Sequence, residues 1–142
     1  MLRIGPSLPI LALIFAATAA AQTPVLDVFK TAAEALSNRD VAKFMEQFDP
    51  AMKDYDVLKQ NITLLVGAEG AQSSIEVVSD EGDDKSRALE IDWLLRVGTG
   101  TAKREILKVT VERRGRGWKI TALAPIDFFG PENGELKFAA AR

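Results

Sequence analysis

Hydrophobic and polar residues alternate most regularly between Lys85 and Val97, in the segment KSRALEIDWLLRV. One face of this segment carries apolar residues at every second position: Leu89, Ile91, Trp93, Leu95 and Val97. The opposite face is mixed and carries Ala88, Glu90, Asp92, Leu94 and Arg96. A period of two is typical of a β-strand with one side in a core. We therefore predict a long strand here, with the Trp93 face as the floor of the core and the Asp92 face outside.

Three further segments are predicted to pair with this strand as an antiparallel meander. They cover residues 73–79, residues 104–114 and the segment that Pro125 ends. If Gly115-Arg116 is a two-residue hairpin loop, Val111 opposes Ile120, Glu112 opposes Lys119 and Thr110 opposes Thr121. This register predicts an inner face of Trp118, Ile120 and Ala122. It places Leu123 outside, with Leu94 and Ile106.

Before the strands, apolar residues recur at helical spacing in three successive segments. The first segment follows Thr23-Pro24 and should end at Asn38, which suits a left-handed terminator. Asp40 is expected to cap a second, short helix. Asp49-Pro50 repeats the pattern of a cap followed by proline, so it is expected to begin a third helix that Gly67 ends. The third apolar stripe comprises Met52, Tyr55, Leu58, Ile62, Leu65 and Val66.

Helices first and strands after them predict an α+β domain. The helices should pack on one face of a curved, mainly antiparallel four-stranded sheet.

The order of these elements resembles the nuclear transport factor 2-like superfamily, which includes ketosteroid isomerases and polyketide cyclases. The resemblance covers about residues 25–129 and is carried by ALSNRD at 35–40, FMEQFDP at 44–50, WKI at 118–120 and residues 125–129. It implies a cone-shaped fold, and dimerisation through the sheet is common among proteins of this kind. We therefore expect a homodimer through the outer sheet face.

The resemblance does not carry over an active site. The ketosteroid isomerase chemistry needs a carboxylate base, a tyrosine and a protonated acid in one apolar pocket. This chain has a single tyrosine, Tyr55, and its strand carboxylates are predicted to face away from Trp93. The strand pair that usually separates the second and third helices also has no room here.

The first residues have the pattern of an export signal. Arg3 precedes the apolar run at residues 8–17, and Ala19-Ala20-Ala21 offers a cleavage site. We predict a signal peptide at residues 1–21, a domain at residues 22–130 and a loose tail at residues 131–142. The mature protein should be periplasmic or secreted and free of the membrane.

Composition excludes several classes of site. The chain has no histidine and no cysteine, so the commonest zinc, copper and haem ligands are missing and no disulfide can form. The net charge of −2 gives no electrostatic reason to bind nucleic acid. The acidic segment from Asp80 to Asp84 fits a solvated turn better than a calcium site. We expect no metal and no cofactor.

The chemical candidates are few. Tyr55, Asp92 and Asp127 are weak catalytic candidates. The expected ligand-binding residues are Tyr55, Trp93, Trp118, Phe128 and Phe129. Three hypotheses follow: a non-catalytic domain that binds a small apolar ligand or a protein, a small lyase or isomerase with one pocket carboxylate, and a structural envelope protein that dimerises through its sheet.

Overall fold

The computed structural model describes residues 25–67 and 69–130, which form three helices followed by a four-stranded sheet. The helices are a first helix over residues 25–37, α2 (Val41–Met45) and α3 (Tyr55–Val66). The strands are β1 (Ala71–Gly82), β2 (Ser86–Val97), β3 (Lys103–Arg114) and β4 (Gly117–Ala124), and a 3₁₀ helix, η1 (Ile126–Phe129), follows them. The predicted α+β architecture is confirmed.

The predicted signal peptide and the predicted tail lie outside the described residues. Within the described part of the chain, no helix is long and apolar enough to cross a membrane.

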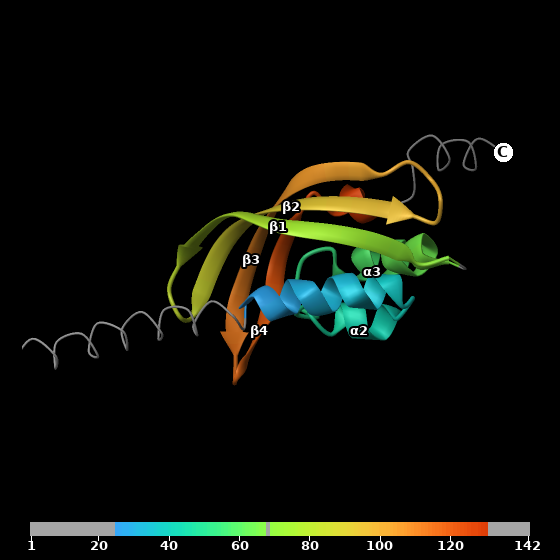
Figure 1. Ribbon diagram of the computed structural model, residues 1–142. Coiled ribbons are helices and arrows are strands. Elements are labelled where there is room, and N and C mark those ends of the chain that lie inside the picture. Colours follow the sequence, from blue (N-terminus) through green and yellow to red (C-terminus); the bar gives the residue numbers. More distant parts are fainter. Residues whose placement is uncertain (1–24, 68, 131–142) are drawn as a thin grey trace, which may run out of the picture.

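The sheet is an antiparallel meander in the order β1-β2-β3-β4, and it arches over the helices (Figure 1). On β2 the predicted inner face is confirmed. Leu89, Ile91, Trp93 and Leu95 are all buried, whereas Leu94 and Arg96 are exposed. The sheet therefore has an inner face covered by helices and an outer face open to solvent.

The β3–β4 hairpin confirms two of the three predicted pairs. Val111 pairs with Ile120 and Glu112 pairs with Lys119, but Thr110 pairs with Ala122 because a β-bulge at Thr121 shifts the register. One extra residue reverses the alternation beyond the bulge. The prediction for the end of β4 is therefore wrong: Ala122 is exposed, and Leu123 is buried in the core.

The helix boundaries were predicted in part. Asp40 caps α2 as expected, because its carboxylate accepts a hydrogen bond from Lys43 N at 3.0 Å. The left-handed residue after the first helix is Arg39 (φ 57°), not Asn38.

The predicted start of the third helix is also wrong. The Asp49 carboxylate accepts a hydrogen bond from Ala51 N, which makes a local turn, and Asp54 is left-handed (φ 64°). Both conformations interrupt a helix, so α3 begins only at Tyr55.

The segment between α2 and α3 is tied to the sheet by a β-bridge. Phe48 forms a parallel β-bridge with Ile120: Asp49 N donates to Ile120 O (2.9 Å), and Ile120 N donates to Gln47 O (2.8 Å). This contact covers part of the free edge of β4. It also holds Phe48, which is 1% exposed, against the sheet.

The buried Phe44 gives a test of this packing. Phe44 is fully buried, so Phe44→Ala should lower the free energy of unfolding by about 3–5 kcal/mol. Leu64→Ala is the control, because Leu64 is 66% exposed and its loss should change stability by less than about 0.5 kcal/mol. Urea denaturation measures both. Equal effects of the two variants would contradict the assignment of Phe44 to the core.

Candidate functional site: the outer face of the sheet

The space between the sheet and the helices is filled by aromatic side chains. Phe129 is central: its ring centroid lies 5.1 Å from that of Trp93, 5.7 Å from Phe44 and 5.1 Å from Phe128. Phe44 in turn contacts Phe48 at 5.0 Å. Three of the five expected ligand-binding residues, Trp93, Phe128 and Phe129, thus pack against one another.

The buried interior of the described residues contains no charged side chain. Among residues 25–67 and 69–130, no polar or charged residue is buried. The indole N–H of Trp93 reaches the partly exposed Ser73, to whose hydroxyl it donates at 3.0 Å. Every titratable side chain of the described residues is therefore at least partly exposed.

Trp118 lies apart from this cluster. It is 4% exposed and packs under the guanidinium of Arg113, whose Cζ is 5.1 Å from the ring centroid. Its indole N–H is buried and has no hydrogen-bond partner in the described structure. Among the described residues, the Trp118 ring makes no ring contact with Trp93 or Phe129.

The three weak catalytic candidates lie on different elements. Tyr55 begins α3 and is half-buried against the core. Asp127 is exposed on η1. Asp92 lies on the outer face of β2, opposite Ile106 of β3. The structure does not bring Tyr55 and Asp92 to one site.

Asp92 is held ionised by an arginine on the neighbouring strand. Arg104 Nε donates to Asp92 Oδ1 at 2.9 Å, and Arg104 Nη2 donates to Oδ2 at 2.6 Å. These hydrogen bonds hold the pKa of the Asp92 carboxyl below its ordinary value, and they raise the pKa of Arg104. A carboxylate with a lowered pKa is a poor general base near neutral pH.

In the acidic turn, the carboxyl group of Asp83 also has a lowered pKa, and its hydrogen bonds hold the turn. Asp83 Oδ1 accepts hydrogen bonds from Lys85 N (2.9 Å) and Ser86 N (3.0 Å), which lower the pKa of its carboxyl. In the part of the chain that the structure describes, no group of three or more acidic residues is placed to hold a metal ion.

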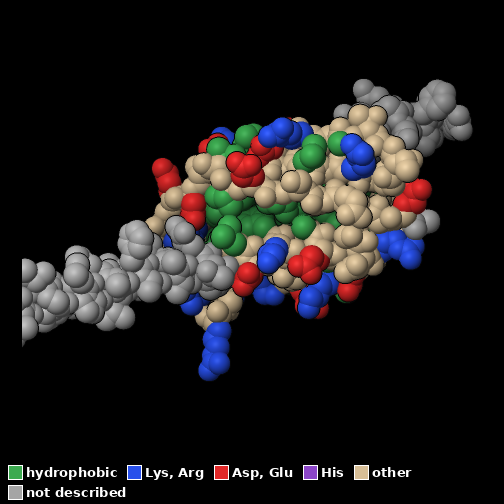
Figure 2. All heavy atoms as spheres, in the orientation of Figure 1, with side chains coloured by type: hydrophobic (Ala, Val, Ile, Leu, Met, Phe, Trp, Pro, Cys, Tyr) green, Lys and Arg blue, Asp and Glu red, His purple; other side chains and the backbone are tan. Residues whose placement is uncertain are grey.

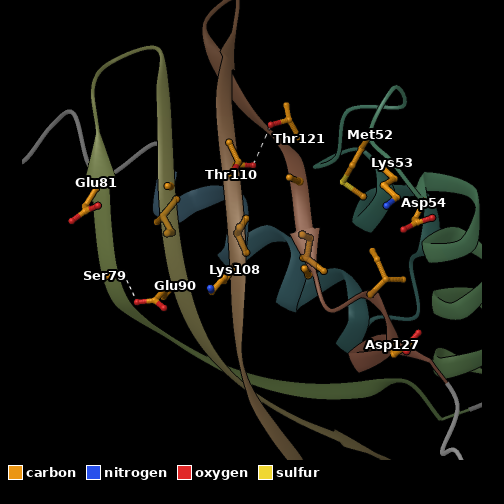
Figure 3. A pocket seen from close by; sticks show the side chains of 17 residues that line it. Met52, Lys53, Asp54, Ser79, Glu81, Glu90, Lys108, Thr110, Thr121 and Asp127 are labelled. Atoms are coloured by element: carbon orange, nitrogen blue, oxygen red, sulfur yellow. Dashed lines mark hydrogen bonds between the residues drawn. The ribbon is translucent and has the colours of Figure 1, made fainter.

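A groove of about 860 Å³ runs across the outer face of the sheet. Figure 3 shows it extending from Glu81 and Ser79 on β1, past Glu90 and Lys108, to the turn at Lys53 and Asp54. Its floor is made of small side chains on the outer face, namely Ala88, Thr110, Ala122 and Ala124. Asp127 lines its far end, whereas neither Tyr55 nor Asp92 does.

Apolar side chains lie beyond one end of this groove. Leu94 is 39% exposed and Ile106 is 47% exposed, and they are diagonal neighbours on β2 and β3. Around them the charges alternate in sign, since Glu90 lies opposite Lys108 and Glu112 opposite Lys119. The outer face therefore combines an apolar centre with a mixed-charge surround.

Sequence reasoning found part of this surface. The alternation identified Leu94, Ile106 and the charged pairs. It missed the groove, because the small residues Ala122 and Ala124 face outwards only as a result of the bulge at Thr121. Lys53 and Asp54 were missed because their segment was expected to be helical.

The ion pair on this face predicts a pH dependence. The folded-state pKa of Asp92 is lowered from 3.8, so its contribution to the free energy of unfolding is complete above about pH 5. The contribution is lost as the pH falls below about 3.8 and through the folded pKa. Asp92→Asn should therefore be less stable than the wild type near neutral pH, and the difference should disappear in acid.

Urea denaturation as a function of pH measures this difference. Arg104→Gln and the double variant complete a thermodynamic cycle, which isolates the pair from other effects of each substitution. A stability difference between Asp92→Asn and the wild type that stays constant from neutral to acid pH would contradict the proposed cause.

The fold is shared with several solved structures at low sequence identity. A Mycobacterium tuberculosis protein of unknown function superposes with a TM-score of 0.65 at 7% identity, over 77% of this chain and 72% of that one. A nuclear transport factor 2-like protein of unknown function from Shewanella oneidensis gives 0.59 at 12% identity, over 72% and 95%. A putative scytalone dehydratase from Novosphingobium aromaticivorans gives 0.59 at 12% identity, over 75% and 83%.

A Bdellovibrio bacteriovorus protein, Bd1075, also matches, with a TM-score of 0.61 at 10% identity, and here the chain spans only 37% of the other's length. No protein-family model and no curated protein sequence matches. A putative dehydratase of the nuclear transport factor 2-like family from Streptomyces avermitilis gives a TM-score of 0.56 at 10% identity, over 73% of this chain and 94% of that one. On its three helices, its curved antiparallel sheet and these superpositions, the chain has the nuclear transport factor 2-like fold.

Proposed function

We propose that this chain is an exported, non-catalytic binding domain that acts through the outer face of its sheet, where it binds a second copy of itself. The observation that carries the proposal is the filled interior. Phe44, Phe48, Trp93 and Phe129 are each at most 1% exposed and pack against one another between the helices and the sheet. The exposed apolar surface lies instead on the outer side, at Leu94 and Ile106.

The size of the outer face supports a protein partner. Three of the strands have 12 residues and are roughly 40 Å long, β4 has eight and is roughly 26 Å long, and neighbouring strands are roughly 4.8 Å apart. Each copy then offers roughly 550–700 Å² of sheet, so a face-to-face pair buries about 1,100–1,400 Å², at the lower end of the range of specific interfaces.

The charges support a second copy over a partner of one sign. A two-fold interface presents the same patch from both sides, so the patch must complement itself. A face that carries both Asp92 with Arg104 and Glu112 with Lys119 meets this condition, whereas a face of one sign would repel its copy.

An enzymatic role has less support. A carboxylate acts as a base in this kind of fold when it is placed in an apolar pocket. Here Asp127 is exposed, and Asp92 is ion-paired on the outer face. Export is proposed on the sequence of residues 1–21 alone.

Sedimentation tests the proposed interface. Ile106→Asp places a charge at its apolar centre and should raise the dissociation constant of the dimer by at least about tenfold. Leu64→Asp is the matched control, because Leu64 is more exposed but lies on α3, in the helical layer that covers the other side of the sheet. A wild-type chain that stays monomeric at all accessible concentrations would refute the proposal.

A dye experiment tests the rival hypothesis of an apolar ligand in the cone. An apolar dye of the anilinonaphthalene sulfonate type should show little added fluorescence with the native protein, because the interior is already filled by aromatic rings. Strong fluorescence that Trp118→Ala abolishes would favour a ligand pocket instead.

A further inference from the structure

The two edges of the sheet differ in how far other segments of the chain cover them. On β4 the outer edge is partly covered by the bridge from Phe48 to Ile120. At the other edge, β1 pairs with β2 alone among the described residues, over a length of 12 residues. The backbone groups along that side of β1 are therefore available to another strand.

An apolar hollow lies beside this free edge. At its beginning β1 touches the end of the first helix, where Gln72 Nε2 donates to Ser37 Oγ at 3.2 Å. A Cβ at Gly70, just before β1, would lie 2.9 Å from Ser37 O, so the backbone there lies close against the end of the first helix. From this point the helix and the strand diverge (Figure 1), and Figure 2 shows hydrophobic side chains in the hollow between them.

The walls of the hollow are incompletely covered apolar residues. Ile75 and Val77 face the core from β1 but are only partly buried. Leu26 on the first helix is 47% exposed. It shares with Ala33 the side of that helix that leads to Ser37, by helical periodicity. The core is thus one strand short of being covered at this edge.

Edge strands that avoid new partners commonly carry inward-pointing charges. On β1 the inward positions from Ala71 to Val77 are uncharged, and the inward Asp80 is neutralised by Arg87 at 2.9 Å. Glu76 and Glu81, which form no direct ion pair among the described residues, are on the outward side, where the charge of Glu76 helps to raise the pKa of Arg104, and the strand has no Lys or Arg. The edge repels another acidic strand but does not block a basic one.

We propose that the free edge of β1 and the hollow beside it bind an extended peptide of a partner protein in which apolar residues alternate with Lys or Arg. The peptide adds a fifth strand to the sheet through main-chain hydrogen bonds. Its apolar side chains fill the hollow over Ile75, Val77 and Leu26. Its basic side chains lie on the outward side next to Glu76 and Glu81.

A second copy of the chain fits this edge less well. Pairing two β1 edges brings the acids of one copy towards the acids of the other, and like charges on neighbouring strands are destabilising. The peptide site is centred on the free edge of β1, whereas the proposed dimer interface is centred on Leu94 and Ile106 of β2 and β3, so the two can be tested separately although Glu76 and Glu81 lie on the outer side of the sheet.

Fluorescence anisotropy with the full chain tests the proposal. The probe is a labelled Val-Lys-Val-Lys-Val-Lys-Val peptide, with Val-Glu-Val-Glu-Val-Glu-Val as the charge control. A third peptide has the first sequence with its backbone nitrogens methylated along one edge, which removes the donors for strand pairing. We expect the first peptide to bind at least about tenfold more tightly than either control, because backbone pairing and charge both contribute.

Variants of the protein locate the site. Glu76→Lys should weaken binding of the basic peptide several-fold, whereas Glu105→Lys makes the same charge change on β3 and should leave binding unchanged. Ile75→Lys should abolish binding, and the methylated peptide remains a test on the unaltered protein should that variant not fold.

The proposal would be overturned by no binding of the basic peptide, by equal binding of the methylated peptide, or by equal effects of Glu76→Lys and Glu105→Lys. Self-association that depends on Glu76 and excludes the peptide would show that a second copy occupies the edge, and would also overturn it. Ile106→Asp should leave peptide binding unchanged, so failure of the dimer and failure of the peptide site can be told apart.

Discussion

The packing of Phe129 against Trp93 and Phe44 is the interaction on which the rest of the structure depends. Phe129 comes from the last described turn of the chain, Trp93 from the middle strand pair, and Phe44 from the short α2. Edge-to-face contacts of this kind add to the free energy gained from burial alone. One ring therefore joins the sheet, the helical layer and the end of the described domain.

Most of the fold could be predicted from the sequence because the helical spacing of the apolar residues and their alternation in the strands are both regular. The inner face of β2 follows directly from alternation, and Asp40 has the residue type and spacing of a helix cap. The errors have local physical causes. At Thr121 one extra residue enters the ladder, and nothing in the residue types there distinguishes a bulge from regular pairing. At Asp49 the same cap-and-proline pattern makes a turn rather than a helix, because Asp54 is left-handed.

The candidate site was predictable only where it follows from alternation. Leu94, Ile106 and the charged cross-strand pairs needed no knowledge of the bulge. The groove could not be predicted without knowledge of the bulge, since its floor includes Ala122 and Ala124, which follow Thr121 and face outwards because of it. The hollow beside β1 depends on the angle between a helix and a strand. Such an angle is fixed by contacts like that of Gln72 with Ser37, between residues 35 positions apart, and sequence periodicity carries no information about it.

The packed aromatic interior and the incompletely covered edge at β1 have the same cause: the helices are too few and too short to cover the whole inner face of the sheet. Three helices, of which α2 has only five residues, are packed beneath four strands. The aromatic rings fill the centre, where the helices meet the sheet, but side chains at the margin have no helix over them. Ile75 and Val77 are at that margin, and they stay partly exposed because the first helix diverges from β1. A sheet with a closed centre and an open edge is suited to extension by a further strand rather than to enclosing a small molecule.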